Sequence, residues 1–210
     1  MRDLVIVGIG GVGRALKAFV EDANRDSDHW RLLGFVDDAE EAQERTISGL
    51  PVLGPVDWLQ TRSSVDVLLG LGDSKTRRSV AEKLKKNSDL FFPSLIHHTA
   101  YIPPKVPIGT GVIVYPGACI DPDTRLGHFV LVNKNVTIGH DTIVGDYATI
   151  APGASIGGDV RMAEGVSIGI GANCKQGIGL GAWSVVGAGA AVTSDVKPAS
   201  TVAGVPAKEI

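Results

Sequence analysis

Aromatic residues are scarce in this chain of 210 residues, at 5% of the total, whereas glycine occurs 27 times. A core built around large rings is therefore excluded, and regular repetition of smaller side chains is the expected alternative. Cysteine is scarce too, since the chain contains only Cys119 and Cys174. These two residues lie far apart and lack the spacing of a disulfide framework or a zinc site. Two such cysteines are typical of a reduced compartment, so we expect the protein in the cytoplasm.

Long hydrophobic runs and an excess of basic residues are also missing. The longest apolar segments are too short to span a membrane, and residues 1–8 (MRDLVIVG) lead into a strand rather than a signal peptide. The net charge of −3 disfavours nucleic acid, which requires a basic face. We expect neither a membrane span nor a nucleic-acid partner.

What the chain does contain is a residue of mostly aliphatic character at every sixth position. The series is Ile96, Ile102, Ile108, Val114, Ile120, Leu126, Val132, Ile138, Val144, Ile150, Ile156, Met162, Ile168, Cys174, Leu180, Val186 and Val192. A small or β-branched residue follows four positions later, for example Ala100, Val106, Val112 and Ala118. This period predicts a parallel β-helix, in which three hexapeptides form a triangular coil and the aliphatic side chains stack inside. At its inward position, Cys174 is expected to be a core residue.

Glycine, asparagine or aspartate often stands directly after the aliphatic position. Examples are Gly109, Asp121, Gly127, Asn133, Gly139, Gly145, Gly157 and Gly169. We interpret these residues as the bends of the coil, where φ can be positive.

The first 90 residues or so have a different pattern, typical of a small parallel α/β domain. Three stretches predict strands, the first and third each followed by a helix: LVIVG (4–8) with the helix in 8–23, RLLGFVDD (31–38), and DVLLGLGDSKTRRSVAEKLKK (66–86). We therefore expect three parts: an α/β domain at 1–92, a β-helix at 93–197 and a C-terminal tail at 198–210.

The glycines after the first strand have the spacing GxGxxG, with two acids at the end of the next strand. The glycines are Gly8, Gly10 and Gly13, and the acids are Asp37 and Asp38. Three interpretations fit: a dinucleotide site, a tight strand-to-helix turn, or a pyrophosphate seat for a single nucleotide. The last is favoured, because only one mononucleotide-sized half precedes the coils.

The stretch VTIGHDTIVG (136–145) places a base and an acid next to each other in the repeat. His140 is two residues past Ile138, so its side chain is expected at a bend and pointing outward. A solitary outward histidine is usually only solvated, but the carboxylate of Asp141 could raise its basicity. Because residues eighteen apart stack, His140 should lie under Gly158, and Ile170 under Ala188.

Several motifs together resemble one family of bacterial sugar acetyltransferases. It comprises hexapeptide acyltransferases related to sialic acid O-acetyltransferase and to the enzymes that N-acetylate nucleotide-linked 4-amino sugars. The matching segments are the glycine turn, FVDD, GLGDSKTRR, LIHHTA, VNKNVTIGHD and the ending VVGAGAAVTSDVKPASTVAGVPAKEI (185–210). The resemblance implies a left-handed β-helix, a homotrimer and direct attack of a sugar amine on acetyl-CoA, without a metal.

The resemblance also assigns residues to roles. The nucleotide sugar would be held by Gly10, Gly11, Val12, Asp37, Asp38, Gly72 and Asp73. His140 would be the catalytic base, and Asp141 the acid that orients it. Acetyl-CoA would lie in a groove lined by Thr149, Gly158, Ile170 and Ala188, with Asn133 near the site. Many members carry histidine where Val12 stands, and some carry histidine at Thr149 or glycine at Ala188.

Other functions remain as alternatives. The acceptor could be the hydroxyl of sialic acid or of another sugar, and a trimer that only binds nucleotide sugars would keep the coils without the chemistry. An NAD-dependent enzyme would use the glycine fingerprint. A zinc hydrolyase on the same coils would need three converging histidines, whereas the only candidates, His128 and His140, fall on different faces.

Overall fold

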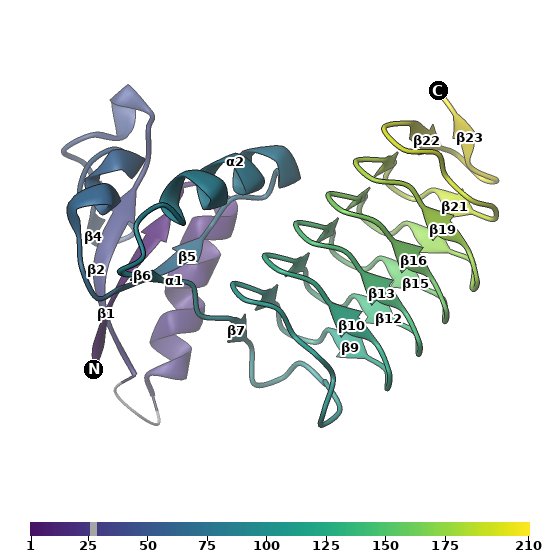
Figure 1. Cartoon of the computed structure of the whole chain (residues 1–210), viewed down its shortest axis with the longest axis horizontal. Coiled ribbons are helices and arrows are strands. Elements are labelled where there is room, and N and C mark those ends of the chain that lie inside the picture. The colour runs from purple at the N-terminus through teal and green to yellow at the C-terminus, as the bar shows by residue number, and fades with distance from the viewer. Residues whose placement is uncertain (26–28) are drawn as a thin grey trace. The chain divides into compact units, whose positions relative to one another are not determined.

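The computed structural model describes residues 1–25 and 29–210 and divides the chain into two compact units, Met1–Ser94 and Leu95–Ile210 (Figure 1). As predicted, the first unit is an α/β domain and the second is a left-handed β-helix. Within the described residues, no helix is long and apolar enough to cross a membrane.

The N-terminal unit contains a four-stranded parallel sheet with the order β2-β1-β5-β6. Its strands and helices are β1 (Arg2–Val7), α1 (Gly11–Ala23), β2 (Trp30–Val36), β5 (Val65–Leu69), α2 (Ser74–Leu84) and β6 (Leu90–Phe91). The connections from β1 to β2 and from β5 to β6 run in opposite directions, so the strand order reverses between β1 and β5. In sheets of this type, ligands bind outside the carboxyl ends of the strands at such a reversal.

The connection between β2 and β5 contains elements that the sequence pattern did not predict. They are the 3-10 turns η1 (Glu40–Ala42) and η2 (Val56–Thr61) and the antiparallel hairpin β3 (Thr46–Ile47) and β4 (Leu50–Pro51). Hydrogen bonds connect η2 to the C-terminal end of α2: the side chain of Gln60 donates to the carbonyl of Lys83, and the side chain of Asn87 donates to the carbonyl of Leu59.

The second unit is a stack of triangular coils whose short strands form three sheets, parallel except for the last strand, and labelled in part in Figure 1. The first sheet contains β7 (Leu95–Ile96), β8 (Ile113–Val114), β11 (Leu131–Val132), β14 (Thr149–Ile150), β17 (Ser167–Ile168), β20 (Val185–Val186), β22 (Thr201–Ala203) and β23 (Lys208–Glu209). The second contains β9 (Cys119–Ile120), β12 (Thr137–Ile138), β15 (Ser155–Ile156), β18 (Asn173–Cys174) and β21 (Ala191–Val192). The third contains β10 (Arg125–Leu126), β13 (Ile143–Val144), β16 (Arg161–Met162) and β19 (Gly179–Leu180).

The predicted aliphatic series forms the core of the coils, together with the small residues four positions later. Ile138, for example, is 1% exposed and Val136 is 0% exposed. Ile96 is the exception: at 40% exposed, it is not a core residue, although the pattern begins there. It lies in the first coil, and within the β-helix its strand pairs on one side only, with β8.

The prediction that φ is positive directly after the aliphatic position was wrong. The left-handed residues stand three positions after the aliphatic residue, and about half of this series is not glycine: it includes Asp123, Phe129, Asn135, Asp141, Tyr147, Asp159 and Trp183. Glycine after the aliphatic residue has another cause, since a Cβ on Gly139 would lie 2.5 Å from the backbone nitrogen of Gly158 in the next coil. Close approach of two backbones, rather than a special φ, therefore requires these glycines.

The C-terminal segment closes the end of the stack. Strand β22 pairs in parallel with β20, and β23 folds back antiparallel onto β22. Backbone groups of the last coil are thereby hydrogen-bonded: Val185 donates to the carbonyl of Ser200, and Gly187 to that of Val202. The first sheet therefore ends in a short, charged antiparallel strand rather than in the open edge of a coil.

Candidate active site

His140 stands at the corner of a coil, between the end of β12 and the start of β13. Its Nδ1 lies 2.7 Å from Oδ2 of Asp141, and the two side chains are 67% and 59% exposed. A carboxylate only accepts hydrogen bonds, so Nδ1 carries the proton in this contact. The lone pair of Nε2 is then available to take a proton from another molecule.

The same contact increases the basicity of the imidazole. The hydrogen bond to Asp141 and the negative charge of its carboxylate raise the pKa of His140 above the usual histidine value. Slight desolvation opposes this effect, and the charges of Asp121 and Asp159 add to it. His140 is therefore a better proton acceptor than a free imidazole.

Two buried threonine hydroxyls hold this corner in place. Thr124 donates to the carbonyl of Gly139 from the coil below, and Thr142 donates to the carbonyl of Gly157 in the coil above. Both threonines are 0% exposed. The backbone nitrogen of Asp159 also donates to the carbonyl of His140 at 2.8 Å. The base is exposed, but its backbone is fixed on both sides, which suits a group that must be positioned.

A second candidate site lies in the N-terminal unit, where β1 and β5 end. A hollow of about 320 Å³ is lined there by Gly8, Gly10, Gly11, Val12, Asp37, Gly70, Leu71, Gly72, Asp73 and Thr76. The structure thus brings together six of the seven residues predicted to bind the nucleotide sugar. The hollow also contains the first residues of α1, where no side chain caps the helix and no acid occupies the first turn. Free N–H groups and the helix dipole favour an anion at such a position.

Two different physical requirements explain the glycines around this hollow. A Cβ on Gly13 would lie 1.9 Å from the carbonyl oxygen of Gly8, and one on Gly70 would lie 2.6 Å from Cα of Gly13. These glycines are needed for the strand-to-helix turn itself. A Cβ on Gly10 or Gly11 would meet nothing within 4 Å. The turn does not require glycine there, which agrees with a ligand that approaches the backbone closely.

The two acids after β2 have different environments. Asp37 lines the hollow, and its carboxylate accepts hydrogen bonds from the backbone nitrogens of Ile9 and Ala39, each at 2.9 Å. Asp38 is the one predicted binding residue outside the hollow. Its Oδ1 accepts from the backbone nitrogen of Val56 at the start of η2, at 2.8 Å. The geometry supports a binding role for Asp37 and a structural one for Asp38.

Sequence reasoning missed Arg77 and the capping role of Asp73, both of which shape the same hollow. Arg77 is 1% exposed, and its guanidinium donates to the carbonyls of Leu71 and Gly72 at 2.8 and 3.1 Å. Asp73 caps α2 by accepting from the nitrogen and hydroxyl of Thr76, and these bonds lower the pKa of its carboxyl. The spacing Asp-x-x-Thr before a helix could have indicated that Asp73 caps α2, whereas no sequence pattern predicts that Arg77 is buried.

The residues predicted to hold acetyl-CoA are divided between two corners of the triangle. Gly158 lies at the corner of His140, one coil further on. Asn133, Ile170 and Ala188 lie at the corner between the first and second sheets, and Thr149 lies in β14 of the first sheet. Ile170 is an unusually exposed aliphatic residue, at 62%. One chain therefore does not bring the whole set together.

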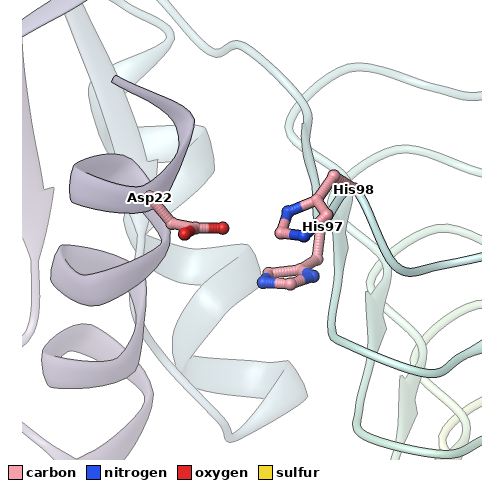
Figure 2. A group of neighbouring side chains, drawn as sticks. All are labelled: Asp22, His97 and His98. Carbon is pink, nitrogen blue, oxygen red and sulfur yellow. The ribbon is translucent and has the colours of Figure 1, made fainter. Parts of the chain in front are cut away.

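The remaining histidines lie elsewhere. His128 is at the corner after β10, where its Nδ1 accepts from the backbone nitrogen of Thr110. The rings of His97 and His98 stack on each other (Figure 2), and their centroids are 4.3 Å apart. Within the described residues, neither His128 nor His140 belongs to a group of three potential metal ligands. This placement argues against the zinc hydrolyase.

Cys174 is 5% exposed in the core, and burial raises the pKa of its thiol to about 12. A thiol in this environment is not a nucleophile at neutral pH.

Comparison with known proteins identifies relatives of both units. Residues 3–84 match the PglD N-terminal domain family, and residues 123–158 match the bacterial transferase hexapeptide family (six repeats). No curated protein sequence matches the chain significantly.

Solved structures match the whole chain. The acetyltransferase domain of PglB from Neisseria gonorrhoeae, in complex with acetyl coenzyme A, is 31% identical with a TM-score of 0.90, covering 100% of this chain and 99% of that one. A mutant of perosamine N-acetyltransferase from Caulobacter crescentus, in complex with CoA and GDP-perosamine, is 26% identical with a TM-score of 0.89, covering 99% and 96%. WeeI from Acinetobacter baumannii is 26% identical with a TM-score of 0.89, covering 100% of both chains.

Proposed function

Because this chain belongs to the family of hexapeptide-repeat sugar acetyltransferases, we propose that it transfers the acetyl group of acetyl-CoA to the amino group of a nucleotide-linked 4-amino sugar. The observation that carries this proposal within the chain is the His140–Asp141 pair, held on a rigid corner with Nε2 available. The protein is an acyltransferase, and a trimer that only binds sugars would have no use for this pair.

In the proposed reaction, the sugar amine attacks the thioester carbonyl directly. A C–N bond forms, the C–S bond breaks, and the amine gives its proton to Nε2 of His140. Coenzyme A leaves as the thiolate and takes up a proton, so the products are the amide and the free thiol. A positioned general base contributes roughly 10²–10⁴-fold to such a step. Asp141 holds the tautomer that leaves Nε2 unprotonated and stabilises the imidazolium that forms.

The two units divide the work. The hollow between β1 and β5 would hold the nucleotide, with the pyrophosphate at the start of α1 and Asp37 within reach of ribose hydroxyls. The coils would bind acetyl-CoA, with the C-terminal tail capping both the stack and the groove. Gly10, Gly11, Val12, Gly72 and Asp73 remain in the nucleotide assignment, and Asp38 is left with its bond at the start of η2.

We also propose that the functional form is a homotrimer. Gly158 shares a corner with His140, but Asn133, Ile170 and Ala188 lie at another corner of the same triangle. A rigid coil cannot bring its own corners together, whereas a neighbouring copy can supply the second corner. The groove would then lie between subunits, and three copies close such a heterologous contact.

The cysteines and the proposed substrates support a location in the cytoplasm. Both cysteines are free in the structure. Unpaired cysteines, together with acetyl-CoA and a sugar nucleotide as substrates, are typical of a reduced cytoplasmic protein.

The decisive experiment measures thiol release from acetyl-CoA with UDP-, GDP- and dTDP-linked 4-amino sugars and with free sialic acid. We expect turnover with at least one amino sugar, and a loss of roughly 10²–10⁴ in kcat for His140→Ala with both substrates still bound. Turnover with sialic acid alone would replace the amine acceptor by a hydroxyl. A His140→Ala variant with full kcat would remove the catalytic assignment.

The trimer has its own test. Light scattering should give three chains per particle, and an active monomer would refute the proposal. In addition, His140→Ala and Ala188→Trp subunits, each inactive alone, should regain about a quarter of wild-type activity when reassembled from an equal mixture, because a random heterologous ring then contains intact pairs of corners. A site built within one chain would regain none.

A further inference from the structure

The position one coil beyond His140 is occupied by Gly158. The residues that stack along this corner are spaced eighteen apart in the sequence: Pro122, His140, Gly158 and Gln176. The coils are in direct contact here, since the backbone nitrogen of Asp159 donates to the carbonyl of His140 at 2.8 Å. The imidazole of His140 therefore lies against the next coil at the point where Gly158 has no side chain.

A side chain at position 158 would collide with the imidazole. A Cβ built there would lie 2.8 Å from Nε2, 2.9 Å from Cε1 and 3.2 Å from Cδ2 of His140. The glycines that directly follow the aliphatic position differ in kind: a Cβ on Gly139, Gly157 or Gly169 would strike backbone atoms of the next coil. At Gly158 the three nearest atoms all belong to the ring of the base.

The backbone itself does not require glycine at this position. Gly158 is not among the residues with positive φ. One coil further on, Gln176 occupies the equivalent place with a full side chain, and one coil earlier His140 does the same. Neither strain nor coil-to-coil packing accounts for the glycine, whereas the ring of His140 beneath it gives a direct physical cause.

We propose that Gly158 is a positioning residue for the general base: its missing side chain allows the imidazole of His140 to lie on the next coil while Nδ1 stays hydrogen-bonded to Asp141. This inference rests on the proposed role of His140. It differs from a contact between Gly158 and acetyl-CoA, because it concerns the Cβ position and not the backbone.

A methyl group at position 158 would push the ring away from the coil. Rotation of the ring breaks or lengthens the 2.7 Å contact between Nδ1 and Asp141, which is the main cause of the raised pKa of His140. The other carboxylates that raise the pKa of His140 are Asp121 and Asp159, and the latter is paired with Arg161 at 3.5 Å. Those groups stay in place, so the change in pKa reports the Asp141 contact.

The experiment compares Gly158→Ala with Gly179→Ala, a control in β19 whose Cβ would touch only the carboxylate of Asp195, at 3.8 Å. Gly158→Ala should lose roughly tenfold to 10²-fold in kcat, the effect of a displacement of about 1 Å. The KM for acetyl-CoA should stay near wild type, because the backbone N–H is retained. The acid limb of the pH–kcat profile should move to lower pH, since the imidazole loses the group that raises its pKa. The control should match wild type in all three measurements.

The double variant separates the possible causes. If Gly158 acts only through the ring, His140→Ala with Gly158→Ala should have the kcat of His140→Ala alone, and any loss of melting temperature in Gly158→Ala should disappear once the ring is removed. A Gly158→Ala variant that keeps kcat and its pH limb overturns the inference, as does one that changes only the KM for acetyl-CoA. If instead His140→Ala keeps full kcat, the proposed role of His140 as the general base is refuted. That result can be distinguished from both outcomes for Gly158→Ala.

Discussion

Two neighbouring glycines in the N-terminal unit should respond to the same substitution in opposite ways. Gly13 is buried, and a Cβ there would lie 1.9 Å from the carbonyl oxygen and 2.9 Å from the carbonyl carbon of Gly8. Both atoms belong to backbone that is held by the sheet, so α1 itself would have to move away from β1. Gly11 begins the same helix, and a Cβ there would meet nothing within 4 Å.

The expected magnitudes follow from these distances. Overpacking costs about 1–3 kcal/mol, and Gly13→Ala should lie at the upper end because no side chain can yield. At about 4–8 °C per kcal/mol for a unit of this size, the N-terminal unit should melt more than about 10 °C earlier. Gly11→Ala should melt within a few degrees of wild type or slightly higher, because alanine is the better helix former by up to about 1 kcal/mol.

For binding of the sugar nucleotide, Gly11→Ala should have the larger effect, although it has the smaller effect on stability. If the pyrophosphate lies against the start of α1, the methyl group of Gly11→Ala occupies its space, and KM for the sugar nucleotide should rise by roughly tenfold, or about 1.4 kcal/mol. KM for acetyl-CoA should not change.

Scanning calorimetry and steady-state kinetics with each substrate varied in turn measure both effects. A Gly13→Ala protein that melts with wild type would refute the packing argument. A Gly11→Ala protein with an unchanged KM for the sugar nucleotide would refute the pyrophosphate seat.

Three substitutions and one chemical modification test individual side chains. Asp37→Ala should raise KM for the sugar nucleotide, whereas Asp38→Ala should lower stability by about 1 kcal/mol and leave that KM unchanged, because its carboxylate caps the start of η2; equal effects on KM would contradict the distinction. Asp141→Asn should shift the acid limb of kcat to lower pH, because the pKa of His140 falls when the carboxylate is lost and the base becomes neutral earlier; an unmoved limb would exclude the coupling. Finally, burial raises the pKa of the Cys174 thiol to about 12, so iodoacetamide should not modify it at pH 8 until the protein is denatured, as mass spectrometry of the native and denatured protein can show.

The β-helix was predictable because its information is local and repeated. An aliphatic residue at every sixth position has the same meaning in each coil, so one exposed member such as Ile96 does not obscure the series. The exact role of the glycines was not predictable. A sequence does not distinguish a glycine needed for positive φ from one needed for close backbone approach, and the true left-handed positions include Phe129, Tyr147 and Trp183.

These three aromatic residues show how the structure accommodates what the pattern leaves unexplained. They stand at one corner, where the rings of Phe129 and Tyr147 stack at 5.4 Å and the ring of Trp183 lies where a Cβ on Gly165 would be. Phe129 is 1% exposed, and Tyr147 is 5% exposed. Packing of rings between successive coils is therefore compatible with the left-handed backbone at this corner, although glycine would adopt it at lower cost.

The candidate sites were predictable to a different degree. The position of His140 followed from the period, but its role followed from the resemblance, since the period says only that a side chain points outward. Asp37 and Asp38 are indistinguishable as letters, and only the path of the chain toward η2 gives the second acid a different partner. The buried Arg77 had no signal at all, because its partners are carbonyl groups five and six residues earlier.

A common logic connects the two sites. In each, the chain uses a rigid element to hold a small number of polar groups and then omits side chains where a second group must approach. Gly10 and Gly11 leave open space at the start of α1, and Gly158 leaves space for the imidazole of His140. Substitutions at these glycines should therefore impair binding or proton transfer without unfolding the protein, whereas Gly13 and Gly139, which face backbone, belong to the fold. Among these five glycines, the atom that a Cβ would meet thus separates those that serve the proposed sites from those that the fold requires.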